Sequence, residues 1–192
     1  MALWDEVSVV GVASVSRVVH ALWAGMFLVW ALAATGATER TWTAANDNGT
    51  FSNPLFYDEF SDPDLIRVGN DYYMTGTTMH AMPGLPVLHS RDLVNWRLLS
   101  YAAPRLDFGP EYRLEAGKEI YGQGVWAPSF RYRNGTFYIF DNLRGQPTQV
   151  FTARDPRGPW TRTPMKRGFH DLSVLFDDDG KAYLSFVPKL SP

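Results

Sequence analysis

The sequence predicts an all-β fold made of repeated hairpins, and three observations carry this prediction. First, one hairpin plan occurs three times along the 192-residue chain, beginning at Asp62, Ala127 and Asp171. Second, the chain is rich in aromatic residues, with 7 Trp, 9 Tyr and 12 Phe. Third, 16 Gly and 13 Pro punctuate it, which suits short strands and tight turns better than helices. Three copies of one hairpin indicate a radial array in which the repeats begin around a common centre.

The first forty residues differ from the rest of the chain. Arg17 and His20 precede an apolar run over residues 21–34, and small residues follow at 35–37. A basic flank, an apolar core and small residues are typical of a secretory signal, so residues 1–37 are interpreted as a signal peptide or N-terminal hydrophobic segment. The protein is therefore expected to be secreted or periplasmic. The alternative is an uncleaved membrane anchor, for which the apolar run is short of the ~20 residues of a bilayer span.

The predicted folded domain spans residues 53–192 and follows a polar linker over residues 38–52. The first repeat covers residues 62–99. Its hairpin is followed by a second pair of strands near residues 87–90 and 96–99, joined by a turn. Four strands of this kind make one propeller blade.

The second repeat copies this plan and the third copies half of it. Asn134 and Gly135 form the turn of the second hairpin, since both residue types tolerate a positive φ. Further strands are expected at residues 149–153 and 160–162, whereas the third repeat provides only a hairpin that ends near Val187. Because propellers close with four to eight blades, these two and a half blades are expected to be a fragment of a larger ring.

Composition limits the partners and cofactors. The formal net charge is −2, and Lys and Arg are scattered, so no nucleic-acid partner is expected. The absence of Cys excludes disulfides and thiolate metal sites. Residues 177–180 read Asp-Asp-Asp-Gly, but they lack the alternating ligand spacing and the distal Glu of an EF-hand. They are interpreted as a hairpin turn, and no metal or other cofactor is expected.

A set of short motifs, in order along residues 53–187, resembles glycoside hydrolase family 43. This is the family of β-xylosidases and α-L-arabinofuranosidases that fold as five-bladed β-propellers. Each motif alone has little specificity, whereas the ordered set is very specific. The matching segments are residues 61–64, 67–73, 83–86, 89–96, 125–129, 158–160 and 176–181.

The resemblance implies an inverting hydrolase with three carboxylates. It assigns Asp62, in its Asp-Pro-Asp segment, as the general base, and Asp171 as the residue that orients the general acid and tunes its pKa. Many members of the family read Asp-Pro-Ser where this chain reads Asp-Leu-Ser over residues 171–173, which indicates a subgroup. The general acid of the family is a glutamate in the fourth blade, and no glutamate follows Glu119 here. The fragment is therefore expected to have at most trace activity alone.

Two carboxyl groups on opposite sides of a sugar suit this chemistry, since inversion needs an ionised base and a protonated acid with room for water between them. A plainer interpretation is that Asp62 and Asp171 only cap turns, where Asp is common. Asp64 competes with Asp62 for the role of base. It lies further along its strand, so a structural hydrogen-bonding role is predicted for it.

Three aromatic or imidazole side chains flank the predicted centre and are candidates for contact with substrate. Trp126 precedes the start of the second repeat, and Phe169 and His170 precede Asp171. An aromatic ring covers the flat C–H face of a sugar well, although Trp126 could equally serve blade packing.

The predicted function is hydrolysis of O-glycosyl bonds in glycans that contain xylose or arabinose, such as xylan, arabinoxylan or arabinan. The alternative from another class is a non-catalytic, sugar-binding propeller fragment. A related five-bladed family with transferase or invertase chemistry is a third possibility. It is disfavoured because its motifs between the two aspartates differ.

Overall fold

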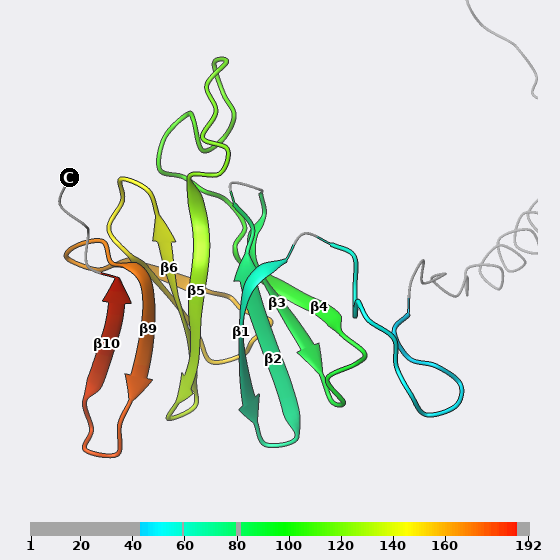
Figure 1. The fold of residues 1–192 in the computed structure, drawn as a ribbon. Coiled ribbons are helices and arrows are strands. Elements are labelled where there is room, and N and C mark those ends of the chain that lie inside the picture. The colour runs from blue at the N-terminus through cyan, green and yellow to red at the C-terminus, as the bar shows by residue number, and fades with distance from the viewer. Residues whose placement is uncertain (1–42, 59, 80–81, 188–192) are drawn as a thin grey trace, which may run out of the picture. The chain divides into compact units, whose positions relative to one another are not determined.

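The computed structural model describes residues 43–58, 60–79 and 82–187, all within one compact unit. These residues form only strands, turns and loops (Figure 1). The strands are β1 Ser61–Val68, β2 Asp71–Thr77, β3 Gly84–Ser90, β4 Arg97–Ala103, β5 Gly124–Arg133, β6 Thr136–Leu143, β7 Gln149–Ala153, β8 Thr161–Pro164, β9 His170–Phe176 and β10 Ala182–Val187. The predicted all-β class is confirmed.

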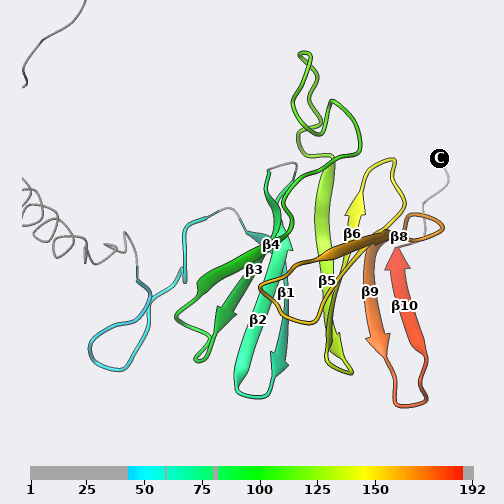
Figure 2. The ribbon, with the colours of Figure 1, turned by 180° about the vertical axis from the view of Figure 1, so that it is seen from behind.

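The strands form three antiparallel sheets that follow the chain in order. The first sheet is β1-β2-β3-β4, the second is β5-β6-β7-β8, and the third is the hairpin of β9 and β10. Consecutive strands are neighbours throughout, so each sheet is a simple meander (Figure 2). Two sheets of four strands and one of two strands agree with the predicted two and a half repeats.

Local turn chemistry explains the tight hairpin of the second sheet. Asn134 and Gly135 have φ values of 49° and 76°, and they connect Arg133 to its cross-strand partner Thr136. Two successive positive φ values match the right-handed twist of the strands that the turn joins, which is why Asn-Gly is favoured there. The Asn-Gly pair in the sequence thus predicts the hairpin because these two residues favour the backbone conformation that the turn requires.

The first strand of each sheet lies beside the first strand of the next. β5 packs against β1 on one side and against β9 on the other, and Figures 1 and 2 show this row from front and back. The starts of the three repeats are therefore brought to the same end of adjacent strands.

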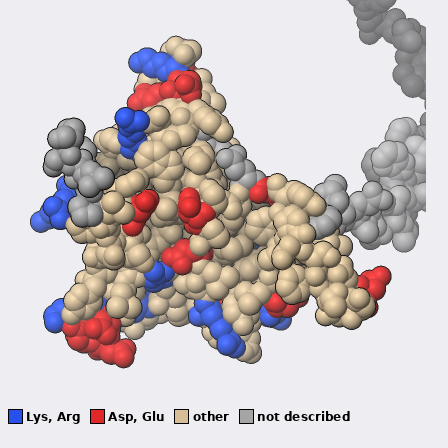
Figure 3. All heavy atoms as spheres, in the orientation of Figure 1, with Lys and Arg blue, Asp and Glu red and all other residues tan. Residues whose placement is uncertain are grey.

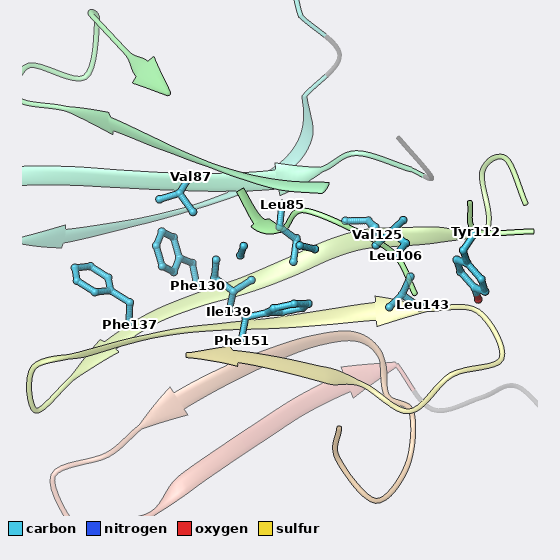
Figure 4. Close-up of a cluster of buried hydrophobic side chains, with 12 residues drawn as sticks. Leu85, Val87, Leu106, Tyr112, Val125, Phe130, Phe137, Ile139, Leu143 and Phe151 are labelled. Atoms are coloured by element: carbon cyan, nitrogen blue, oxygen red, sulfur yellow. The ribbon is translucent and has the colours of Figure 1, made fainter. Parts of the chain in front are cut away.

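The larger core cluster lies between the first and second sheets. It joins Leu85 and Val87 of β3 to Phe130 of β5 and Ile139 of β6, each with no exposed surface (Figure 4). Trp160 packs at its margin, and its indole Nε1 donates a hydrogen bond of 3.2 Å to the Ser100 hydroxyl of the first sheet. Burial of large apolar side chains from both sheets locks the two sheets together.

A smaller cluster joins the second sheet to the third. Phe140 of β6 packs with Leu172 and Val174 of β9. Because side chains alternate along a strand, β6 directs Phe137 and Ile139 to the first cluster, while Phe140 faces the second. The second sheet is consequently covered on both faces by the described residues.

The outer side of the third sheet stays exposed. Leu175 and its cross-strand partner Tyr183 expose 60% and 46% of their surface, respectively. Leu172 and Val174, on the opposite face of β9, expose 3% and 1%. The described residues thus bury one face of this hairpin only.

Residues 177–180 form the turn predicted for them. The Asp177 amide donates to the carbonyl of Lys181, and the Gly180 amide donates to the carbonyl of Asp177. The Lys181 ammonium lies 2.8 Å from Oδ2 of Asp179. Within the described ranges, no group of three or more His, Asp or Glu side chains is arranged to hold a metal ion.

The predicted signal segment, residues 1–37, lies outside the described residues. Within the predicted linker, residues 43–52 form a short loop in which the Ser52 amide donates to the Ala44 carbonyl and Ala44 is buried. No helix in the described part of the chain is long and apolar enough to cross a membrane.

Candidate active site

Each repeat begins with the same backbone irregularity. Asp62, Ala127 and Asp171 have φ values of 45°, 37° and 45°, a left-handed conformation that costs a non-glycine residue about 1–3 kcal/mol. The pairing register shifts at the same place in all three hairpins. In each, two residues of the first strand oppose a single residue of the second, which defines a β-bulge.

A bulge redirects the side chain at its first position away from the pleat of the sheet. Here it does so at the equivalent position of three adjacent strands, two of which carry a carboxylate. Asp62 and Asp171 therefore occupy structurally equivalent positions on β1 and β9, and Ala127 occupies that position on β5 between them. Backbone strain repeated at these positions indicates a functional site rather than ordinary turns.

The Asp62 carboxylate is held by a threonine from the neighbouring strand. The hydroxyl of Thr77 donates a hydrogen bond of 2.9 Å to Oδ2 of Asp62. The same hydroxyl accepts a bond of 2.9 Å from the amide of Ala127. Thr77 is 1% exposed, so this link between the first and second sheets is shielded from water.

Asp64 has the structural role predicted for it. Its Oδ2 accepts a hydrogen bond of 2.9 Å from the Phe130 amide and one of 2.6 Å from the Arg131 guanidinium. The second sheet repeats this link to the third, because the Ser129 hydroxyl accepts a bond of 3.1 Å from the Val174 amide. In the first two sheets, the residue two places after the bulge thus ties its sheet to the next one.

Asp171 is linked to the aromatic side chains predicted around it. Nε2 of His170 lies 3.6 Å from Oδ2 of Asp171, and the two side chains are about half exposed. The His170 ring meets the Trp126 indole edge to face, with ring centroids 6.0 Å apart. Trp126 is in turn the neighbour of Ala127, whose amide connects to Asp62 through Thr77.

A pocket of about 740 Å³ brings the three predicted substrate residues together. Trp126, Phe169 and His170 all line it. Asp62 and Asp171 are not among its lining residues, although Asp171 directly follows His170, which is one of them. Figure 3 shows acidic side chains gathered in the middle of this face of the molecule, with basic side chains above and beside them.

Four residues around this site escaped the sequence analysis. Thr77 holds Asp62, while Asn142, Arg144 and Arg167 line the pocket. Asn142 alone had a usable signal, because it is a polar residue at the end of an alternating apolar strand. The two arginines lie in loops, where the sequence offers no periodicity to place them.

Asn142 is buried and oriented by a short chain of hydrogen bonds. The Phe169 amide donates to the Thr148 hydroxyl over 2.9 Å, and that hydroxyl donates to Oδ1 of Asn142 over 3.3 Å. With its oxygen engaged, the amide Nδ2 has no hydrogen-bond partner although Asn142 is only 5% exposed. Its surroundings therefore fix the orientation of this side chain in the pocket wall.

Successive antiparallel sheets whose first strands lie side by side are the blades of a β-propeller. The family model described as glycosyl hydrolases family 43 matches residues 51–189. The chain belongs to this family, and the resemblance inferred from the motifs is confirmed.

Individual relatives agree with this assignment. The chain is 41% identical over 140 residues to a non-reducing end alpha-L-arabinofuranosidase of Bacteroides ovatus, covering 70% of this chain and 25% of the relative. It is 37% identical over 145 residues to a xylan 1,3-beta-xylosidase of a Vibrio species, covering 70% and 26%. The chain thus spans about a quarter of the length of these curated relatives.

Solved structures support the fold. The chain superposes with a TM-score of 0.66 and 39% identity on a structure described as a bifunctional GH43-CE protein of Bacteroides eggerthii, covering 70% of this chain and 19% of that one. The family 43 structures that it resembles are five-bladed β-propellers, of which this chain accounts for part.

Proposed function

We propose that this chain forms part of the catalytic propeller of an inverting glycoside hydrolase. The observation that carries the proposal is the repeated bulge. It places Asp62 and Asp171 at equivalent positions near the start of β1 and β9 and turns both side chains out of the pleat of their sheets. Membership of family 43 supports it independently.

In this proposal Asp62 is the general base. It would accept a proton from the water that attacks the anomeric carbon, on the face of the sugar opposite the leaving group. The Thr77 hydroxyl, which donates to Oδ2, leaves Oδ1 of the carboxylate for that water. Inverting enzymes keep base and acid roughly 6.5–9.5 Å apart so that the water fits between them.

Asp171 would orient the general acid and keep it protonated. A carboxylate near an acid disfavours loss of its proton, because two like charges at close range repel. The acid itself has no counterpart among the 192 residues, since no glutamate follows Glu119. A positioned general acid contributes about 10²–10⁴-fold, so the chain alone is expected to hydrolyse glycosides at trace rates at most.

The proposed substrates are glycans with xylose or arabinose units at a chain end or side chain. Names of relatives support this class, since they include an arabinofuranosidase and a xylosidase. Trp126 would lie against the C–H face of a sugar, with Phe169 and His170 beside it in the pocket.

A chimera tests the catalytic roles. Residues 51–187 would replace the matched segment of the Bacteroides ovatus arabinofuranosidase, which supplies the remainder of the ring. Hydrolysis of aryl arabinofuranoside or aryl xyloside is expected, with inversion of the anomeric configuration seen by proton NMR. Asp62→Asn and Asp171→Asn should each lower kcat by at least about 10²-fold. A folded chimera whose activity survives Asp62→Asn would contradict the proposal.

A second candidate is sugar binding without hydrolysis. It is favoured by the pocket that Trp126, Phe169 and His170 share. Titration of the 192-residue chain with xylo- or arabino-oligosaccharide distinguishes the two candidates when it is combined with the chimera. Binding by the chain with an inactive, folded chimera favours the second candidate.

Export of the protein is also proposed. The support is the basic, apolar and small-residue pattern over residues 1–37. N-terminal sequencing of the mature protein tests it, and an N-terminus near Thr38 is expected after cleavage. Retention of Met1 on a membrane-bound product would favour the anchor instead.

A further inference from the structure

The pocket beside the candidate active site is lined by positive charge and by no carboxylate. Arg144 and Arg167 line it, from the loop after β6 and the loop after β8, respectively. No Asp or Glu is among its described lining residues. Two guanidinium groups on the wall of one pocket, with no carboxylate among its described lining residues, favour an anionic ligand over a neutral one.

The backbone and side chain of Arg144 are both anchored. Its amide donates to the Gln123 carbonyl over 2.9 Å, and its carbonyl accepts from the Tyr112 hydroxyl over 2.9 Å. Its guanidinium Nη1 donates to Oε1 of Gln123. These contacts hold the arginine at the rim while its other N–H groups form no ion pair within the described part of the chain.

The side chain of Arg167 is oriented by an aromatic ring. Its Cζ lies 4.7 Å from the centroid of the Phe169 ring, and Phe169 also lines the pocket. An arginine over an aromatic face is oriented by the ring without consuming its hydrogen-bond donors. Arg167 likewise forms no ion pair with a described acidic side chain.

Asn142 adds a polar residue to the pocket wall. It lines the pocket, and its Oδ1 accepts a hydrogen bond from the Thr148 hydroxyl. Its Nδ2 is buried and has no partner, whereas buried donors are almost always paired in folded proteins. A local shift that opens Nδ2 to the pocket would let an acceptor group of a bound ligand pair with it.

We propose that this pocket binds the carboxylate of an acidic sugar, a uronic acid unit carried by the glycan next to the xylose or arabinose unit. This inference rests on the proposed glycoside-binding function and specifies its substrate class. The planar guanidinium groups of Arg144 and Arg167 match a carboxylate through paired N–H···O bonds. Asn142 would donate to a ring or hydroxyl oxygen of the same unit, with the Trp126 indole against its apolar face.

Binding of matched oligosaccharides to the 192-residue chain tests the proposal. The probes are a xylo-oligosaccharide that carries one glucuronic acid unit, the neutral xylo-oligosaccharide of equal length, and the same neutral chain with a sulfate ester. Calorimetry or NMR titration at low salt should show at least roughly tenfold tighter binding of the uronic acid probe than of the neutral one. Raising the salt concentration should narrow this ratio, because charge attraction is screened.

Arg162 offers a matched control for Arg167. Its Cζ lies 4.6 Å from the Phe108 ring centroid, and it is exposed as Arg167 is, but it does not line the pocket. Arg167→Gln and Arg144→Gln should each weaken binding of the uronic acid probe severalfold more than binding of the neutral probe. Arg162→Gln should leave both unchanged. Asn142→Asp, of equal size, should remove the preference by setting a carboxylate against the ligand.

The outcomes separate this inference from the function on which it rests. Equal affinity for the acidic and neutral probes would overturn the acidic-sugar site and leave the sugar-binding site standing. A stronger preference for the sulfate ester than for the uronic acid would overturn the carboxylate assignment. Binding of neither probe would contradict the proposed function as well. If Arg167→Gln lowered the affinity for the acidic and the neutral probe by the same factor, the role of this arginine would be only structural.

Discussion

Replacing Asp64 by alanine should loosen the contact between the first two sheets. Its Oδ2 is the acceptor for the Phe130 amide at 2.9 Å and for the Arg131 guanidinium at 2.6 Å. Phe130 has no exposed surface, so in the variant water would not reach its amide without a local opening. Arg131 keeps other acceptors, including the Ser173 hydroxyl at 2.9 Å.

The magnitude follows from these two losses. A buried N–H left without an acceptor costs about 1–3 kcal/mol. The Asp64–Arg131 pair is partly exposed, with 29% and 25% of the side-chain surface accessible, so its loss adds about 0–1 kcal/mol. The sum, about 1–4 kcal/mol, is a large part of a total stability of about 5–15 kcal/mol. For a domain of this size it lowers Tm by about 2–16 °C.

Thermal and urea unfolding, followed by tryptophan fluorescence, measure this loss. Asp64→Asn retains one acceptor oxygen for the Phe130 amide and should lose less than half as much. Asp178→Ala is the control, because this exposed turn residue has only a backbone bond and should change stability by less than about 0.5 kcal/mol. If Asp64→Ala destabilised the chain no more than Asp178→Ala does, the inter-sheet role of this carboxylate would be refuted.

Three further predictions concern other parts of the fold. Burial raises the pKa of Asp141, whose two side-chain oxygens have no partner, so the folded state favours the protonated form. Its contribution to stability is complete below the unfolded pKa of about 3.9 and is lost as pH rises toward the raised folded value. Urea unfolding at pH 4 and pH 8 should therefore show that the free energy of unfolding of Asp141→Asn rises relative to that of the wild type as pH increases. An equal difference between the two proteins at both pH values would refute this. Leu172→Ala should cost about 2–5 kcal/mol, whereas Leu175→Ala, at a side chain 60% exposed, should cost less than about 0.5 kcal/mol in the same assay. Thr77→Val should destabilise by about 1–3 kcal/mol, because it removes a buried hydroxyl that both donates and accepts, and a neutral result in thermal unfolding would count against the bridge to Asp62.

The fold was predictable because its signals are local. Asn134 and Gly135 adopt positive φ values that few other residue pairs tolerate, so these two residues alone predict the turn. The three repeats place Asp62, Ala127 and Asp171 in register without any knowledge of tertiary contacts. The alignment of the three hairpins by sequence is sufficient to predict a radial array.

The geometry of the site was less predictable because it depends on pairing between strands. The bulges arise where two residues of one strand oppose one residue of the next, and composition does not reveal such a register shift. Asp64 illustrates the consequence. Alternation within its own strand indicated a structural role, but its partners Phe130 and Arg131 belong to a different sheet. Arg144 and Arg167 likewise come to line one pocket only through the fold.

The most direct test of the shared site is an NMR titration of the isotope-labelled chain with xylo- or arabino-oligosaccharide. The central claim is that the starts of three repeats face one sugar. The backbone amide signals of Asp62, Ala127 and Asp171 should therefore shift together and fit a single Kd, while those of the turn over residues 177–180 stay in place. Shifts confined to one repeat, or separate Kd values for Asp62 and Asp171, would contradict the claim.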